Sequence, residues 1–248
     1  MKKSGAWLAR YALEQLPISH TFGIPGVHNT ELYDELNTSE VITPILVTHE
    51  GCGGFMADGM SRVGENIGCL LIVPAAGVTH AASAIGEAYL DGIPMLIIAG
   101  GIRDESAFGY QLHEVDQHSL LKPITKKTYK ISQHEEIIST IFEAYKLAIS
   151  GEPGPVFIEI PVNIQLDRGE ISQLLEFKPS NVVVEHNEAS IKQAVELLRQ
   201  AKKPGLFVGW GAVDSSAELI KIAEYLNAPV ATTLQGLRSF PANHPLHV

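Results

Sequence analysis

Residues 41–73 read VITPILVTHEGCGGFMADGMSRVGENIGCLLIV, and the rest of the chain repeats the arrangement that they contain. The segment opens with the apolar run Val41–Val47, continues through Gly51–Arg62, which is rich in small residues and suits a helix, and returns to an apolar run at Gly68–Val73. Short apolar runs bounded by glycine or proline are typical of buried parallel strands, because such strands are apolar on both faces. The segment therefore predicts a strand, a helix and a second strand parallel to the first.

The same alternation extends in both directions along the chain. Helical periodicity occurs at residues 4–16 and 134–149, and further apolar runs occur at Ser19–Ile24, Met95–Ala99 and Val156–Ile160. Strands that alternate with helices build an α/β domain of three layers, in which helices flank a parallel sheet. We expect this domain to cover residues 1–165.

A second α/β region follows a polar stretch. Residues 166–188 lose the periodic pattern, which predicts a linker, and residues 189–248 contain the pattern of two helices and two strands. The chain stops at Val248, soon after the second of these strands, so the region is shorter than an ordinary domain. We interpret residues 189–248 as the beginning of an incomplete second α/β domain.

Composition argues against several classes of protein. The formal net charge is −10 and the basic residues are scattered, which does not suit a nucleic-acid-binding protein. Cys52 and Cys69 show no pairing pattern, which favours a reducing compartment, and we expect the cytoplasm. No apolar run approaches the roughly 18 residues that a membrane span needs, and the N-terminus lacks the apolar core of a signal peptide.

Chemistry is expected in the loops that follow the apolar runs, because ligands of α/β sheets bind at the carboxyl ends of the strands. Glu50 is the strongest candidate, since it follows one apolar run and opens the helix candidate Gly51–Arg62. The helix dipole would favour its ionised form and burial would oppose it. Taken alone, the position of Glu50 favours a first-turn glutamate that only complements the dipole.

Other catalytic signatures are weak or absent. His28, His49, His80, His113 and His118 show no spacing that sets two metal ligands on one helix face, so no metal site is predicted. Walker loops and serine nucleophile elbows are absent. A nucleotide-binding oxidoreductase remains a minor alternative, because the turn Gly209–Gly211 lacks the third glycine of a dinucleotide fingerprint.

Taken together, the loops resemble the N-terminal pyrimidine-binding domain of thiamine-diphosphate enzymes of the acetolactate synthase type. The resemblance continues into the beginning of the central domain and runs along nearly the whole chain. It rests on motifs in the family's order, namely Phe22–Gly26, His49-Glu50, Ala57–Gly59, Gly77–His80, Asp91–Pro94, Gly151–Val156 with Ile160-Pro161, and Lys203–Ala212.

The resemblance implies a catalytic role for Glu50. In the family this carboxyl group hydrogen-bonds N1′ of the cofactor's aminopyrimidine, which helps that ring to remove the proton from thiazolium C2, so that the resulting ylid attacks a 2-keto acid. By the same resemblance, the residues expected to bind the cofactor are Ile24, Pro25, Gly26, Val27, Glu50, Thr79 and His80.

Departures from the family pattern leave the substrate open. Ile24, Val27 and His80 stand where tyrosine, glycine and asparagine are frequent, and Gln111 or His113 corresponds to a glutamine on the substrate side. The leading hypothesis is a carboligase or decarboxylase of 2-keto acids. The alternatives are a related lyase or decarboxylase, of the benzaldehyde lyase or oxalyl-CoA decarboxylase type, and a non-catalytic binding module on the same fold.

The resemblance also implies partners. Enzymes of this family bind the diphosphate through Mg²⁺ in a third domain, and the pyrimidine domain of one subunit faces the diphosphate domain of another. Nothing after Pro161 supplies the motif of that third domain, so the Mg²⁺ site is expected outside this chain. We therefore expect a homodimer or homotetramer in the complete enzyme, and an inactive protein from this chain alone.

Overall fold

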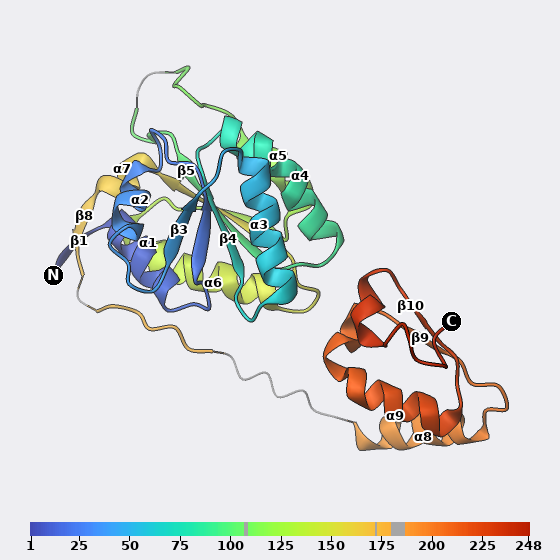
Figure 1. The fold of residues 1–248 in the computed structure, drawn as a ribbon. Coiled ribbons are helices and arrows are strands. Elements are labelled where there is room, and N and C mark those ends of the chain that lie inside the picture. The colour runs from blue at the N-terminus through green and yellow to red at the C-terminus, as the bar shows by residue number, and fades with distance from the viewer. Residues whose placement is uncertain (107–108, 172, 180–186) are drawn as a thin grey trace. The chain divides into compact units, whose positions relative to one another are not determined.

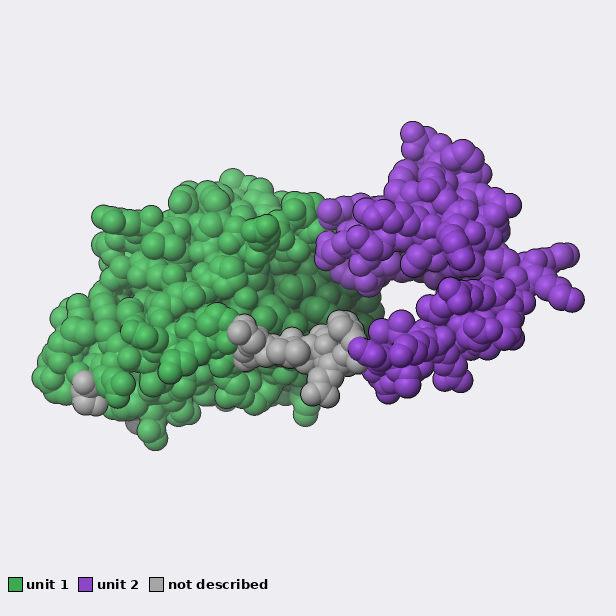
Figure 2. Space-filling view, turned by 90° about the horizontal axis from the view of Figure 1, so that it is seen from below, with its two compact units in different colours: residues 1–179 green, residues 180–248 purple. Residues whose placement is uncertain are grey.

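The chain divides into two compact units, Met1–Pro179 and Ser180–Val248 (Figure 2). The computed structural model describes residues 1–106, 109–171, 173–179 and 187–248. Each unit is an α/β structure of its own, and the candidate site lies in the first.

A six-stranded parallel sheet forms the centre of unit 1 (Figure 1). Every residue of the three strands at positions three to five of the sheet is buried, as expected of strands covered on both faces. The three-layer parallel fold predicted from the sequence is confirmed. In spatial order the strands are β3 (Thr43–Leu46), β2 (His20–Gly23), β4 (Gly68–Ile72), β5 (Met95–Gly101), β7 (Pro155–Pro161) and β6 (Lys127–Lys130).

Helices cover both faces of this sheet (Figure 1). Alternate residues of a strand point to opposite faces, so Leu71 and Ile98 pack with α1 and α6, while Leu70 lies beside α3. The 3₁₀ turns Lys122–Ile124 and His134–Glu136 complete the connections. The helices of unit 1 are α1 (Gly5–Glu14), α2 (Thr30–Leu36), α3 (Glu50–Val63), α4 (Ala76–Leu90), α5 (Gln117–Leu121), α6 (Ile137–Ile149) and α7 (Val162–Leu166).

Gly68 marks the tightest approach of helix α3 to the sheet. A Cβ atom on Gly68 would lie 1.9 Å from the carbonyl oxygen of Ala57, so no side chain fits without a backbone shift. We expect Gly68→Ala to lower the free energy of unfolding by about 2 kcal/mol, as overpacking does. Urea unfolding followed by Trp7 fluorescence, in a Trp210→Phe background that silences unit 2, measures this change.

The matched control is Gly59→Ala in helix α3. A Cβ atom there would have no neighbour within 4 Å, so the variant should gain about 0.5–1 kcal/mol from the better helix propensity of alanine. Equal effects of the two substitutions would contradict the proposed close contact at Gly68.

The polar stretch after the sheet is partly structured. Strand β8 (Arg168–Glu170) pairs antiparallel with β1 (Lys2–Ser4), and Phe177 packs edge-on against Phe142 and Tyr145. Residues 166–171 and 173–179 of the segment expected as a linker are therefore part of unit 1, because β8 pairs with β1 and Phe177 covers α6. Residues 172 and 180–186 of that segment lie outside the described residues.

The described part of unit 2, residues 187–248, contains two helices and a two-stranded parallel sheet. Its core is small and consists of Leu219, Ala223, Val230 and Phe240, with α8 contributing no buried residue. The elements are α8 (Glu188–Gln200), β9 (Leu206–Val208), the 3₁₀ turn Trp210–Ser215, α9 (Ser216–Leu226), β10 (Val230–Thr232) and the 3₁₀ turn Gln235–Ser239. Within the described residues, no helix is both long and apolar enough to cross a membrane.

Candidate cofactor site

Glu50 is the first residue of helix α3, directly after the loop that follows β3. The Nδ1 atom of His49 accepts a hydrogen bond from the backbone N–H of Gly51 at 3.0 Å and so caps the helix. Glu50 retains only 8% of its accessible surface, although it is an ionisable residue. The exposed N–H groups of the first helical turn favour a carboxylate at this position.

His80 holds one oxygen of this carboxyl group. Its Nδ1 lies 3.0 Å from Oε2 of Glu50, and its ring stacks on that of His49 with 4.8 Å between the ring centres. Among the residues that the structure describes, no donor contacts the other oxygen, Oε1. A Cβ atom on Gly77 would lie 3.6 Å from Oε1, so glycine keeps space open beside it.

The loop after β2 reaches the same place. Asn29 closes this loop, because its side chain accepts from the N–H of Gly26 at 2.7 Å and donates to the carbonyl of Ile24 at 3.2 Å. Cβ atoms on Gly26 and Gly77 would lie 2.6 Å and 3.0 Å from the two γ-methyl groups of Val73. Val73 therefore joins the turn at Pro25 to the turn that faces Glu50.

Of the predicted cofactor-binding residues, Glu50 and His80 are in contact, and Gly26 lies beside Val73, which also packs against the turn at Gly77. Val27 is 67% exposed beside the closed loop. Thr79 is exposed in the first turn of α4 and donates to the carbonyl of Ala76 at 3.1 Å. Ala75 precedes this helix with a φ of 56°, a conformation that costs a non-glycine residue energy and occurs often at functional sites.

Gln111 and His113 lie apart from Glu50, in the loop 109–116 between β5 and α5. The amide of Gln111 donates to the carbonyl of Arg103 at 3.1 Å. An open hollow of about 640 Å³ lies against Gly109, Tyr110, Gln111 and Glu114. Within the described residues, no contact joins this loop to Glu50, so the structure does not bring the two substrate-side candidates to the carboxyl group.

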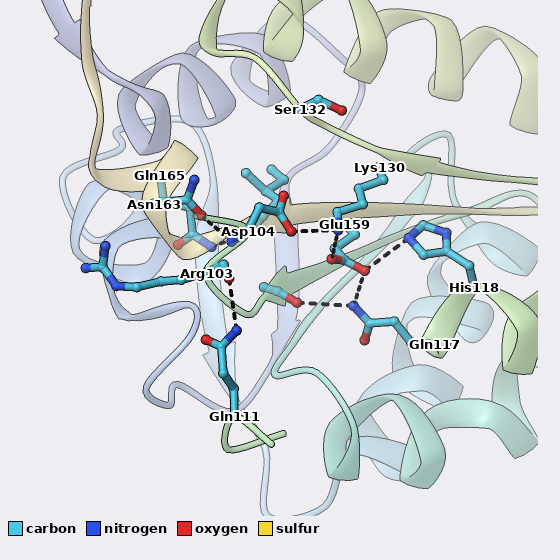
Figure 3. Close-up of polar contacts among 12 residues, drawn as sticks. Arg103, Asp104, Gln111, Gln117, His118, Lys130, Ser132, Glu159, Asn163 and Gln165 are labelled. Carbon is cyan, nitrogen blue, oxygen red and sulfur yellow. Dashed lines mark hydrogen bonds and ion pairs between the residues drawn. The ribbon is translucent and has the colours of Figure 1, made fainter. Parts of the chain in front are cut away.

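A polar cluster around Glu159 was not foreseen from the sequence. Glu159 is 5% exposed near the end of β7, where Gln117 donates to it at 2.6 Å and His118 and Lys130 lie 3.0 and 3.7 Å away (Figure 3). Burial alone would raise the pKa of Glu159, but hydrogen bonds from His118 and Gln117 and the charges of His118 and Lys130 together lower it. The available signal was one carboxylate inside the apolar run Val156–Ile160.

The cysteines do not add a nucleophile to the site. Cys69 is wholly buried in β4, and burial raises the pKa of its thiol to about 12, which keeps it protonated. Cys52 is exposed on α3. In the described ranges, no three histidine, cysteine or acidic side chains gather as metal ligands would.

Comparison with known proteins gives the family. Residues 3–120 match the family described as thiamine pyrophosphate enzyme, N-terminal TPP binding domain, and residues 191–248 match its central domain. The chain belongs to the thiamine pyrophosphate enzymes. The N-terminal and central domains are matched in the same order along the chain as the sequence motifs indicated.

Individual relatives extend this result along nearly the whole chain. The chain is 36% identical over 249 residues to the acetolactate synthase large subunit of Haemophilus influenzae, covering 98% of the chain and 44% of the relative. It is 33% identical over 248 residues to the isozyme 3 large subunit of Escherichia coli, covering 97% and 43%. The probable large subunit of Methanocaldococcus jannaschii is 32% identical over 245 residues, covering 95% and 41%. The chain therefore spans less than half the length of these relatives.

Proposed function

We propose that the chain is the N-terminal part of a thiamine-diphosphate-dependent carboligase or decarboxylase of 2-keto acids, most like acetolactate synthase. The observation that carries this proposal is the state of Glu50. Its carboxyl group is buried at the carboxyl edge of the sheet, one oxygen lies on His80, and the other faces the space that Gly77 leaves. A buried proton-sharing carboxyl with one open oxygen is what the family's chemistry requires.

Thiamine diphosphate would supply the carbon nucleophile that attacks the 2-keto group. The residues of this chain fit its pyrimidine ring, because Glu50 offers an acceptor to a ring nitrogen and the glycines leave room for a flat group. His80 fixes the orientation of the carboxyl group through Oε2, so that Oε1 holds or releases the shared proton. Ile24, Pro25, Gly26 and Val27 would line one side of the ring and Thr79 the neighbouring turn.

The remaining parts of the proposal concern the metal, the partner subunit and the compartment of the complete enzyme. We propose that Mg²⁺ and the diphosphate bind in another domain, that this domain belongs to a second subunit of a homodimer or homotetramer, and that the enzyme works in the cytoplasm. The relatives reported above carry the name acetolactate synthase. Their names favour pyruvate over the substrates of benzaldehyde lyase or oxalyl-CoA decarboxylase.

A fusion protein tests this function. Residues 1–248 are joined to the segment that follows the matched region in the Escherichia coli isozyme 3 large subunit, and acetolactate formation from pyruvate is measured. The fusion protein is expected to form acetolactate only when both thiamine diphosphate and Mg²⁺ are present. The same C-terminal segment without residues 1–248 is the control and should be inactive. A folded, dimeric fusion that binds the cofactor and consumes no 2-keto acid would show that the chain is a binding module.

A further inference from the structure

Tyr33 connects the two segments that border the candidate cofactor site. It lies on α2, is 7% exposed, and its backbone N–H donates to the carbonyl of Asn29 at 3.1 Å. Its hydroxyl group donates to the carbonyl of Leu71 in β4 at 2.9 Å. Asn29 closes the loop after β2, and Leu71 lies two residues before Val73. One side chain therefore joins the end of β4 to the loop that follows β2.

The hydroxyl group of Tyr33 replaces a backbone donor of the sheet. The parallel pairing of β2 with β4 ends at Gly23 and Leu71. Val47 of the loop after β3 donates to the carbonyl of Gly23, so Gly23 is turned toward β3 and the next residue, Ile24, toward β4. The N–H of Ile24 would be the next donor to the carbonyl of Leu71, but among the described contacts that carbonyl accepts from Tyr33 instead. The pairing of the two strands stops at this hydrogen bond.

The junction between the two strands is tightly packed. A Cβ atom on Gly23 would lie 1.7 Å from the carbonyl oxygen of Leu71 and 2.6 Å from the hydroxyl oxygen of Tyr33. Only glycine fits there, and the hydrogen bond from Tyr33 to Leu71 is buried. Burial, with smaller contributions from Cys69 and Glu50, raises the pKa of Tyr33, so the hydroxyl group keeps the proton that it donates.

This junction lies where the connections of the sheet change direction. From β2 the chain continues to β3 on one side, and from β4 it continues to β5 on the other. Ligands of α/β sheets bind in the crevice between two such strands, outside their carboxyl ends. Tyr33 approaches the crevice from the face that α1 and α6 cover, whereas Glu50 opens α3 on the opposite face. Tyr33 thus forms the back of the crevice that Glu50 borders.

We propose that Tyr33 is a positioning residue of the candidate cofactor site, because its hydroxyl group stops the pairing of β2 with β4 and keeps the crevice beside Glu50 open for a flat ring. The inference rests on the proposed function for the identity of that ring, and it assigns Tyr33 no contact with cofactor or substrate. Val73 transmits the effect, since it lies against both Gly26 and Gly77. A shift of β4 toward the loop after β2 would change the space beside Oε1 of Glu50.

Tyr33→Phe removes the hydroxyl group alone and tests this role. It leaves the carbonyl of Leu71 without a donor, and a buried acceptor without a donor is costly. The N–H of Ile24 is the next backbone donor in the register, so we expect the pairing of β2 with β4 to extend by one hydrogen bond. The extension draws the loop 24–27 toward β4 and narrows the crevice.

Hydrogen exchange measured by NMR on residues 1–248 tests this rearrangement without the cofactor. The amide proton of Ile24 should exchange about tenfold more slowly in Tyr33→Phe than in the wild type, as expected from one added hydrogen bond. The matched control is Tyr145→Phe, which removes the hydroxyl group of a tyrosine that is 8% exposed on α6. It should leave the exchange of Ile24 unchanged. An Ile24 exchange rate that is the same in Tyr33→Phe and in the wild type would overturn the inference.

Cofactor binding by the fusion protein tests the consequence for the site. Isothermal titration with thiamine diphosphate in the presence of Mg²⁺ should show about tenfold weaker binding in Tyr33→Phe, because opening the crevice again costs the added hydrogen bond. The KM for pyruvate at saturating cofactor should stay at the wild-type value. Equal cofactor affinities of Tyr33→Phe and Tyr145→Phe would overturn the positioning role. A fusion protein without turnover would reject the proposed function, while the exchange of Ile24 would still decide the role of Tyr33.

Discussion

Glu50→Gln is expected to lower turnover of 2-keto acids by about 10²- to 10⁴-fold in the complete enzyme, the usual contribution of a proton-transferring side chain. Glutamine keeps the size of the side chain and can still contact His80, but it cannot share a proton with a ring nitrogen through Oε1. The loss should appear in kcat at saturating cofactor and substrate. Steady-state measurement of pyruvate consumption with excess thiamine diphosphate and Mg²⁺ checks it.

The control distinguishes proton transfer from a helix dipole effect. Glu188 is exposed in the first turn of α8. Like Glu50 it complements a helix dipole, but it lies outside the candidate cofactor site. Glu188→Gln should change turnover less than twofold and, like Glu50→Gln, should alter stability by about 1 kcal/mol or less. Near wild-type turnover of Glu50→Gln would reduce Glu50 to a capping charge and remove the proposed function.

The architecture was predictable because its causes are local. The apolar runs at Gly68–Val73 and Met95–Ala99 are flanked by glycine or proline, and strands buried on both faces need such runs. Glu50 was predictable for the same reason, since its position follows from a strand end and a helix start. Its burial and its contact with His80 are known only from the structure. His80 lies on helix α4, which follows a different strand, so no local pattern around Glu50 indicates this contact.

The parts that were missed depend on long-range contacts. Glu159 meets Gln117 and His118 only because the chain returns to the sheet edge after the loop that follows β5. Tyr33 and Leu71 are likewise 38 residues apart in sequence. The pairing of β1 with β8 brings together segments near the two ends of unit 1. Each strand has only three residues, which is too short for a sequence pattern to predict the pairing.

Glu159→Gln is expected to lower the free energy of unfolding by about 3 kcal/mol at neutral pH, the lower end of the cost of breaking a buried charge pair. The groups around Glu159 are all donors, namely Gln117, His118 and Lys130. A carboxylate offers them two acceptor oxygens, whereas glutamine offers one and turns its own N–H₂ group toward a donor. His118 and Lys130 are partly exposed, which lets them regain water and keeps the cost from being larger.

The pH dependence of this difference identifies the charge as its cause. The pKa of Glu159 in the folded protein lies below its ordinary value of 4.5, so the ionised form stabilises the fold above that value. The stability difference between wild type and Glu159→Gln should shrink as the pH falls through the folded pKa of Glu159, because the protonated carboxyl group no longer carries the charge that its donors stabilise. This stability difference is measured at each pH by urea unfolding followed by Trp7 fluorescence, again in the Trp210→Phe background.

Glu143→Gln is the matched control, because Glu143 also has a lowered pKa but is exposed on α6. Hydrogen bonds from Tyr129 and Lys127 lower the pKa of Glu143, and solvent screens that pair. Its loss should cost about 0.2–1 kcal/mol. If Glu159→Gln cost no more than Glu143→Gln at every pH, burial would not strengthen the contacts of Glu159. The polar cluster around Glu159 would then contribute no more to stability than a surface network, and it would not stabilise the packing of β7 against β6 and α5.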